Sequence, residues 1–165
     1  YEIRPRDWSS DVCSSDLADN ACLVGIDRSN VTMAMHLCRG NGARGQWHTR
    51  GGYDAIAERV FGEINVDTFL LEYDSDRAGT FEPLRFVPKN KNVVLGLITT
   101  KAGELESQEL LLKRIDEASK ILSLDNLALS PQCGFASVMT GDPLTFDDQR
   151  KKLDLVVSTA RKVWG

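Results

Sequence analysis

The residues with the clearest chemical potential are His36, Cys38, Glu72 and Cys133. His36 and Cys38 lie two positions apart in residues 31–41, a stretch that begins as an apolar, β-prone run and ends in a glycine-containing loop. Side chains alternate along a strand, so the imidazole and the thiol point the same way. Such a pair supplies half of a tetrahedral zinc site. Alone it does not establish one, because buried cysteine is common.

The elements that must position these residues follow an alternating pattern. Apolar, β-prone runs occur at residues 31–37, 68–71, 92–100 and 127–129, and helical patterns occur at 18–26, 53–64, 107–122 and 145–163. Gly25 is expected to end the first helix, and Ser107 to begin the third in a capping box. The apolar spacing predicts which side chains these last two helices bury: Leu110, Leu111, Ile115, Ala118 and Leu122 in the third, and Leu153, Val156, Val157 and Ala160 in the fourth.

This alternation predicts an α/β fold with roughly four βα units. The predicted strands are almost continuously apolar, as strands covered on both faces must be. The chemically interesting residues follow the strands, as in TIM barrels, whose active sites gather at the carboxyl ends of the strands. Four units are half of a (β/α)8 barrel, so we expect the C-terminal half of one. An open doubly wound sheet is the alternative that the same pattern permits.

In a barrel the strand ends meet at one mouth, where Glu72 and Cys133 can join His36 and Cys38. One nitrogen, two thiolates and one carboxylate form a ligand set that zinc accepts. Considered separately, Glu72 could be a salt-bridge partner and Cys133 a buried apolar thiol. Their shared position after a strand favours the metal site.

The composition limits the classes of function. The net charge of −4 gives no electrostatic argument for binding nucleic acid or an anionic membrane. No apolar run approaches the roughly 20 residues that span a bilayer. Four scattered cysteines do not form a secreted disulfide framework, which favours a reducing cytoplasm.

Residues 1–17 differ from the rest of the chain. They are polar and aperiodic, and residues 7–17 match the in-frame translation of a common sequencing adapter. We interpret this segment as artefactual, with a natural disordered tail as the alternative. Residues 18–165 are then a fragment that begins within a longer protein.

Three motifs resemble the metal motifs of cobalamin-independent methionine synthase, in its C-terminal catalytic barrel. They are His36-Leu37-Cys38, Glu72 after Phe-Leu-Leu, and Pro-Gln-Cys133-Gly. The resemblance covers residues 18–165. The spacing from Glu72 to Cys133 is similar to that of the family, whereas the spacing from Cys38 to Glu72 is longer. Cys-Arg-Gly-Asn, Leu-Glu-Tyr-Asp and Leu-Ser-Pro-Gln-Cys-Gly-Phe are most similar to the shorter bacterial members.

The resemblance implies that His36, Cys38, Glu72 and Cys133 bind Zn²⁺, and that a methyl group passes to the thiol of homocysteine, forming methionine. Zinc favours the thiolate, the form that attacks carbon. Where folate-using members carry Asp and His, this chain has Thr-Thr-Lys101, which puts methyltetrahydrofolate in doubt as the donor. Lys101 is a candidate general acid or substrate anchor; a solvated lysine is the alternative.

Further polar residues flank the proposed ligands. Arg39, Asn41, Ser75 and Arg77 are candidates to hold a carboxylate or sulfonate, with bracing of the loops as the alternative role. Three other functional readings remain open. The enzyme could alkylate another thiol, such as coenzyme M; the fragment alone could be inactive and self-associating, because half a barrel leaves strand edges unpaired; or the chain could be a simple zinc-binding module.

Overall fold

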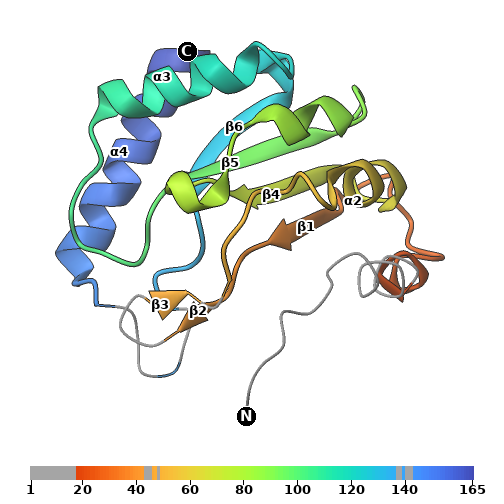
Figure 1. The fold of residues 1–165 in the computed structure, drawn as a ribbon, viewed down its shortest axis with the longest axis horizontal. Coiled ribbons are helices and arrows are strands. Elements are labelled where there is room, and N and C mark those ends of the chain that lie inside the picture. The colour runs from red at the N-terminus through yellow and green to blue at the C-terminus, as the bar shows by residue number, and fades with distance from the viewer. Residues whose placement is uncertain (1–17, 43–45, 48, 137–138, 140–142) are drawn as a thin grey trace.

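The computed structural model describes residues 18–42, 46–47, 49–136, 139 and 143–165 (Figure 1). The predicted segment 1–17 lies outside these residues. A helical turn at residues 18–22 comes first, and Gly25 follows it with a φ of 81°, as predicted. The further elements are β1 (Ala34–Leu37), β2 (Asn41–Gly42), β3 (Gln46–Trp47), α2 (Ala57–Glu63), β4 (Thr68–Glu72), η2 (Asp76–Ala78), η3 (Glu82–Phe86), β5 (Asn92–Ile98), α3 (Gln108–Ser119), η4 (Leu124–Asn126), β6 (Leu127–Pro131) and α4 (Phe146–Trp164).

The main sheet contains four parallel strands in the order β1-β4-β5-β6. A separate antiparallel pair, β2 and β3, lies near the end of β1 (Figure 1). A doubly wound sheet reverses its strand order at a switch point. Here the spatial order follows the chain without reversal, as in one half of a (β/α)8 barrel. The predicted half barrel of four βα units is therefore the observed architecture.

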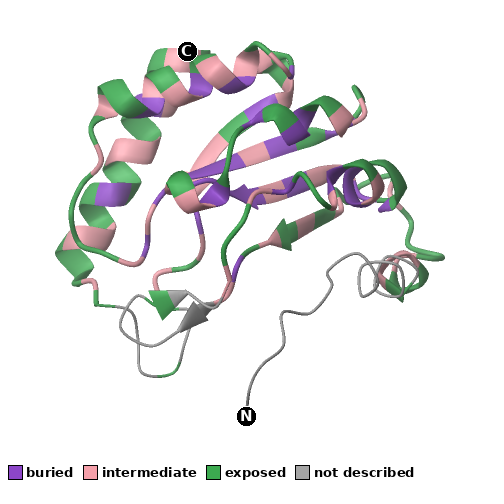
Figure 2. Cartoon of the chain, in the orientation of Figure 1, coloured by how far each residue is buried: buried purple, intermediate pink, exposed green. Residues whose placement is uncertain are grey.

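The two faces of the sheet differ in burial. Phe69, Leu71, Val93 and Leu95 point to one face and are almost fully buried in the core. Positions of the opposite parity are more open along most of the sheet, with exposed His36 on β1 and partly buried Leu70 and Val94 on β4 and β5. Glu72 and Ile98, at the carboxyl ends of β4 and β5, are buried exceptions. Figure 2 shows the buried residues concentrated in β4 and β5, with β1 lacking them. The open face is the one that would line the interior of a closed barrel.

Helices α3 and α4 pack against each other and against β5 and β6 (Figure 1). The predicted burial of Leu111, Ile115, Ala118 and Leu122 is confirmed. Leu110, also predicted to be buried, is 50% exposed. The predicted capping box at Ser107 is wrong: the Ser107 hydroxyl accepts from the Leu110 amide, but a leucine cannot return the bond. The reciprocal box occurs instead between Thr145 and Asp148 of α4.

The predicted inner face of α4 is confirmed at Val156, which packs against the core, and is wrong at Leu153 and Val157. Leu153 and Val157 are 42% and 48% exposed, whereas Lys152 and Thr159 are fully buried. The reason is a buried polar anchor. Lys152 Nζ donates to the Glu104 carbonyl at 2.5 Å and to Glu106 Oε2 at 3.0 Å, which fixes the rotation of the helix.

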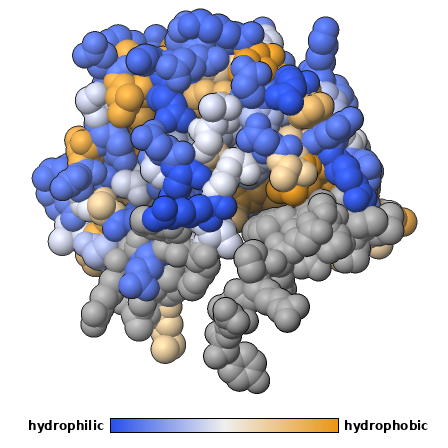
Figure 3. Space-filling model, viewed as in Figure 1, coloured by the Kyte–Doolittle hydropathy of each residue, from blue (hydrophilic) through white to orange (hydrophobic). Residues whose placement is uncertain are grey.

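The surface carries several exposed apolar side chains. On the face shown in Figure 3, hydrophilic residues predominate and hydrophobic areas interrupt them. Phe146, Leu153, Val157 and Trp164 share one side of α4, at spacings of seven, four and seven residues. No helix among the described residues is long and apolar enough to cross a membrane.

We predict that Lys152→Ala lowers the free energy of unfolding by about 3 kcal/mol, because it leaves the Glu106 carboxylate buried without its cation. The Glu106 side chain is 14% exposed and that of Lys152 is 0% exposed. Lys151→Ala is the matched control, since Lys151 is 54% exposed and pairs only at the surface, where the loss is about 0.5 kcal/mol or less. Urea denaturation measures both changes. Equal effects of the two variants would contradict the anchoring role of Lys152.

We also predict that the chain self-associates in solution. Among the described strands, β1 and β6 each pair on one edge only, and α4 presents apolar side chains to solvent. Sedimentation velocity at micromolar concentration should show species larger than 18.3 kDa. Leu153→Lys should reduce association, whereas Asp154→Lys at the neighbouring exposed position should not. A monomer at all concentrations would refute this prediction.

Candidate metal centre

The side chains of His36, Cys38 and Cys133 converge at the carboxyl end of the sheet. Cys133 Sγ lies 3.4 Å from His36 Nε2, and the three candidate donor atoms all lie within 4.8 Å of one another. His36 is near the end of β1, Cys38 directly follows β1, and Cys133 follows β6 by two residues. The structure therefore brings together three of the four residues predicted to bind metal.

This convergence depends on the curvature of the sheet. In a flat sheet, β1 and β6 would be three strand spacings apart, or about 14 Å. Their terminal side chains approach within 3.4 Å, so the sheet must curl as it does in a barrel. The curl brings side chains at the ends of the two edge strands together at the mouth of the half barrel.

Burial shifts the pKa values of two residues in the cluster. His36 lies on the open face, yet partial burial of its ring lowers the pKa of His36 and favours the neutral imidazole that binds metals. Burial, reinforced by the neighbouring Cys38 thiol, raises the pKa of Cys133 to about 12. The Cys133 thiol is therefore protonated at neutral pH in the metal-free site, and a bound cation would favour its thiolate form.

Glu72, the fourth predicted ligand, is held by cations instead. Its side chain is fully buried, and its carboxylate accepts bonds from Arg77 and, at 2.8 Å, from the Arg39 amide. Lys101 Nζ lies 3.5 Å from the same carboxylate. The group of converging donor atoms comprises His36, Cys38 and Cys133 and does not include Glu72.

Of the residues predicted to contact substrate, Arg39, Ser75 and Arg77 form contacts within the protein. Arg39 braces the loops: its guanidinium bonds to the carbonyls of Gly51, Glu72 and Ala78 and stacks on Tyr53 at 4.4 Å. Arg77 pairs with Glu72 and also with Asp74 at 3.3 Å, and the Ser75 hydroxyl lies 3.4 Å from Asp74. Asn41 forms part of β2, and its side chain lies outside what the structure describes.

Lys101 follows β5 and faces the same charged cluster. Burial lowers the pKa of Lys101, while the charge of Asp74 opposes this shift. Its amide donates to the Thr99 hydroxyl at 3.2 Å, and the Thr99 amide donates to Glu106 at 2.7 Å. The buried Lys152–Glu106 pair therefore also steadies the loop that carries Lys101.

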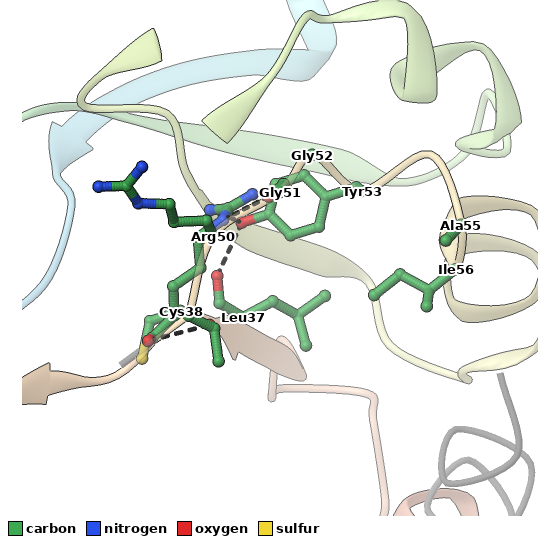
Figure 4. A pocket seen from close by; sticks show the side chains of 10 residues that line it. Leu37, Cys38, Arg50, Gly51, Gly52, Tyr53, Ala55 and Ile56 are labelled. Carbon is green, nitrogen blue, oxygen red and sulfur yellow. Dashed lines mark hydrogen bonds between the residues drawn. The ribbon is translucent and has the colours of Figure 1, made fainter. Parts of the chain in front are cut away.

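A cavity of about 240 Å³ adjoins the cluster at Cys38 (Figure 4). It lies between the end of β1 and the start of α2. Its lining is Leu37, Cys38, Arg39, Thr49, Arg50, Gly51, Gly52, Tyr53, Ala55 and Ile56. A second, more open hollow lies on the concave face beside His36, Leu70 and Cys133. The candidate metal centre is thus reachable from the open face of the half barrel.

Sequence reasoning missed two residues that shape this site. Tyr53 places its hydroxyl between the ends of β1 and β4. Gly96 of β5 pairs with Ser130 of β6 and lies against Gln132, which precedes Cys133. A Cβ at Gly96 would be 2.8 Å from both Gln132 Cα and the Leu71 carbonyl oxygen. The one signal in the sequence is the presence of a glycine inside an apolar strand, since such a glycine often marks the close approach of another backbone.

We predict that Gly96→Ala destabilises the fold by about 1–3 kcal/mol and weakens metal binding, because the backbone before Cys133 must move. Gly62→Ala is the control: its Cβ would meet nothing within 4 Å, and alanine favours the helix. Urea denaturation and Zn²⁺ competition with a chromophoric chelator measure the two effects. Unchanged zinc affinity in Gly96→Ala would contradict the proposed close fit.

Comparisons with known proteins show the family to which the chain belongs. The family model for the cobalamin-independent synthase catalytic domain matches residues 31–162. Uncharacterized proteins YxjH and YxjG of Bacillus subtilis (strain 168) are 52% and 51% identical over 136 residues, 82% of this chain. The chain spans 36% of the length of each.

Two solved structures are similar as well. A putative vitamin-B12 independent methionine synthase from Listeria monocytogenes has a TM-score of 0.69 at 31% identity, with 100% of this chain and 44% of that one covered. A B12-independent methionine synthase from Shewanella sp. W3-18-1, in complex with selenomethionine, has a TM-score of 0.75 at 21% identity, with 95% and 45% covered, and supports the fold alone. The chain thus belongs to the family of the cobalamin-independent methionine synthase catalytic domain.

Proposed function

We propose that this chain is the C-terminal half of the catalytic barrel of a zinc-dependent enzyme that transfers a methyl group to the thiol of homocysteine, forming methionine. The observation that supports this most is the convergence of His36, Cys38 and Cys133 within 4.8 Å. Membership of the methionine synthase family supports the reaction class. The specific substrates are our inference, since the chain spans only part of its relatives.

The donor set fits zinc. One imidazole and two thiols match the Cys₂His set of catalytic zinc sites, which keep a further position for water or substrate. Zinc in such a site favours the thiolate form of a thiol substrate, which is the nucleophile in methyl transfer. His36, Cys38 and Cys133 would hold it. Both cysteines would bind as thiolates, so together they would neutralise the divalent charge.

Glu72 is the proposed fourth ligand only before the thiol binds. Its pairing with Arg77 and Lys101 is the arrangement that we expect once the carboxylate has left the metal. The two cations would then stabilise the released carboxylate in its buried position. X-ray absorption with and without thiol tests this exchange, and an unchanged ligand set would exclude it.

The charge of the surrounding network suits an anionic substrate. Arg77 pairs with the carboxylates of Glu72 and Asp74, and Lys101 pairs with Glu72. The Arg39 guanidinium adjoins them through the Glu72 backbone carbonyl, so these five side chains carry one positive charge in excess. This excess would stabilise an incoming thiolate or the acidic group of the substrate. Arg77 and Lys101 are the residues that we propose for this role, since the guanidinium of Arg39 already bonds to three loop carbonyls.

The acceptor and the donor can be separated experimentally. The same cations would also accept the sulfonate of coenzyme M, so competition between homocysteine and coenzyme M distinguishes the two acceptors. Lys101 stands where folate-using members carry other residues, and we propose a methyl donor other than methyltetrahydrofolate. Because the thiols must remain reduced to bind zinc, a cytoplasmic location is part of this proposal.

We predict about one zinc per chain by elemental analysis and at least a tenfold loss of affinity in Cys133→Ser. Cys22→Ser is the matched control, because Cys22 is an exposed free thiol that is not a member of the donor cluster. A folded chain without zinc, or equal affinities in both variants, would refute the metal site. We expect no methyl transfer by the isolated chain. Activity should appear when the upstream region of YxjH is joined to it.

A further inference from the structure

Tyr53 lies in the loop before α2 and is 5% exposed. Its ring packs edge-on against Tyr73, with centroids 5.3 Å apart, and beneath the Arg39 guanidinium at 4.4 Å. These contacts leave the ring one orientation, with the hydroxyl directed at the end of β1. Figure 4 shows the resulting bond to Leu37.

The hydroxyl joins two strands. Tyr53 Oη donates to the Leu37 carbonyl at 2.9 Å and accepts from the Glu72 amide at 2.8 Å. Arg39 Nη1 donates to the same oxygen at 3.3 Å. A phenol has one donor and two acceptor sites. The Glu72 amide and Arg39 use the two acceptor sites, and the single proton goes to the Leu37 carbonyl, which is nearer than the Glu72 carbonyl at 3.3 Å. Burial raises the pKa of Tyr53 to about 12, which keeps its proton available to Leu37.

The position of this bond in the sheet is informative. The last registered pair of the β1–β4 ladder is Leu37 with Leu71. The hydroxyl lies between the next carbonyl and amide, those of Leu37 and Glu72, and so takes the place of a further ladder bond. It separates the two strands by one oxygen atom at the point where β1 delivers Cys38 to the metal cluster. At the same point the carboxylate of Glu72, at the end of β4, pairs with Arg77 and Lys101.

A phenylalanine at this position would keep the ring packing but lose the bridge. The Leu37 carbonyl and the Glu72 amide would then be buried without their partner, or would close on each other. Either change displaces the peptide that precedes Cys38. His36 would remain in its ladder, so the distance between its imidazole and the Cys38 thiol would no longer be fixed.

Resting on the proposed function, we propose that Tyr53 is a positioning residue of the metal centre, whose hydroxyl bridge between Leu37 and Glu72 fixes Cys38 relative to His36 and Cys133. Outer partners of metal ligands commonly contribute ten- to hundredfold in affinity. Tyr53 acts through the backbone of the ligand strand, and its own side chain need not touch the metal.

The test is a titration of the metal-free chain with Co²⁺, in which the thiolate-to-cobalt charge-transfer absorption reports binding. Tyr53→Phe should bind Co²⁺ ten- to hundredfold more weakly than wild type, with a weaker or shifted absorption band. Tyr73→Phe is the matched control, because the Tyr73 hydroxyl is buried yet forms no hydrogen bond with the described residues. Its affinity should stay within twofold of wild type.

The outcomes separate this inference from the proposed function. Wild type without Co²⁺ binding overturns the proposed function and the inference with it. Equal affinities in wild type and Tyr53→Phe overturn the inference alone, as does a variant that is less stable but binds normally. Amide hydrogen exchange at Glu72 in the wild type needs no variant: slow exchange supports the bridge, and exchange as fast as in a surface loop overturns it.

Discussion

The curl of the four-stranded sheet is the constraint on which the candidate site depends. Parallel pairing fixes each strand to its neighbour, but it is the curvature that brings the ends of β1 and β6 within reach of each other. Small backbone features accommodate this curvature. Gly96 lets the chain before Cys133 approach β5, and the register shift between Gly96 and Ile98 places one extra residue in β5 near its end, where such a bulge bends the strand. The metal donors are thus a consequence of sheet geometry.

A second layer of the site consists of buried charges. Glu72 has no access to solvent, and its pairing with Arg77 and Lys101 offsets the cost of burying it. The Arg39 backbone amide donates a hydrogen bond to the Glu72 carboxylate, and the Arg39 guanidinium donates one to the Glu72 backbone carbonyl. This network connects the ends of β1, β4 and β5. A change in the position of Glu72 therefore affects three of the four strand ends at once.

The sequence allowed the strands and the site to be predicted where local pattern decides them. Apolar runs locate the buried strands, and the rule that parallel strands end at one edge predicts that His36 and Cys133 meet. The rotation of α4 could not be predicted, because burial of Lys152 depends on Glu106, 46 positions away. The role of Tyr53 could not be predicted either, because the apolar spacing made it the first residue of a predicted helix over residues 53–64. Its hydroxyl acquires its role only through contacts between separate strands.

The position of the candidate donors within the half barrel has a physical consequence. All three converging donors, and the cations around Glu72, belong to the four βα units described above. The open face beside them has no such groups opposite it in the described residues. On the proposed function, binding of a metal would require only the curl of one half barrel, whereas enclosing a substrate and excluding water would require a closed barrel. Metal affinity and methyl transfer would then be separable properties with different structural requirements.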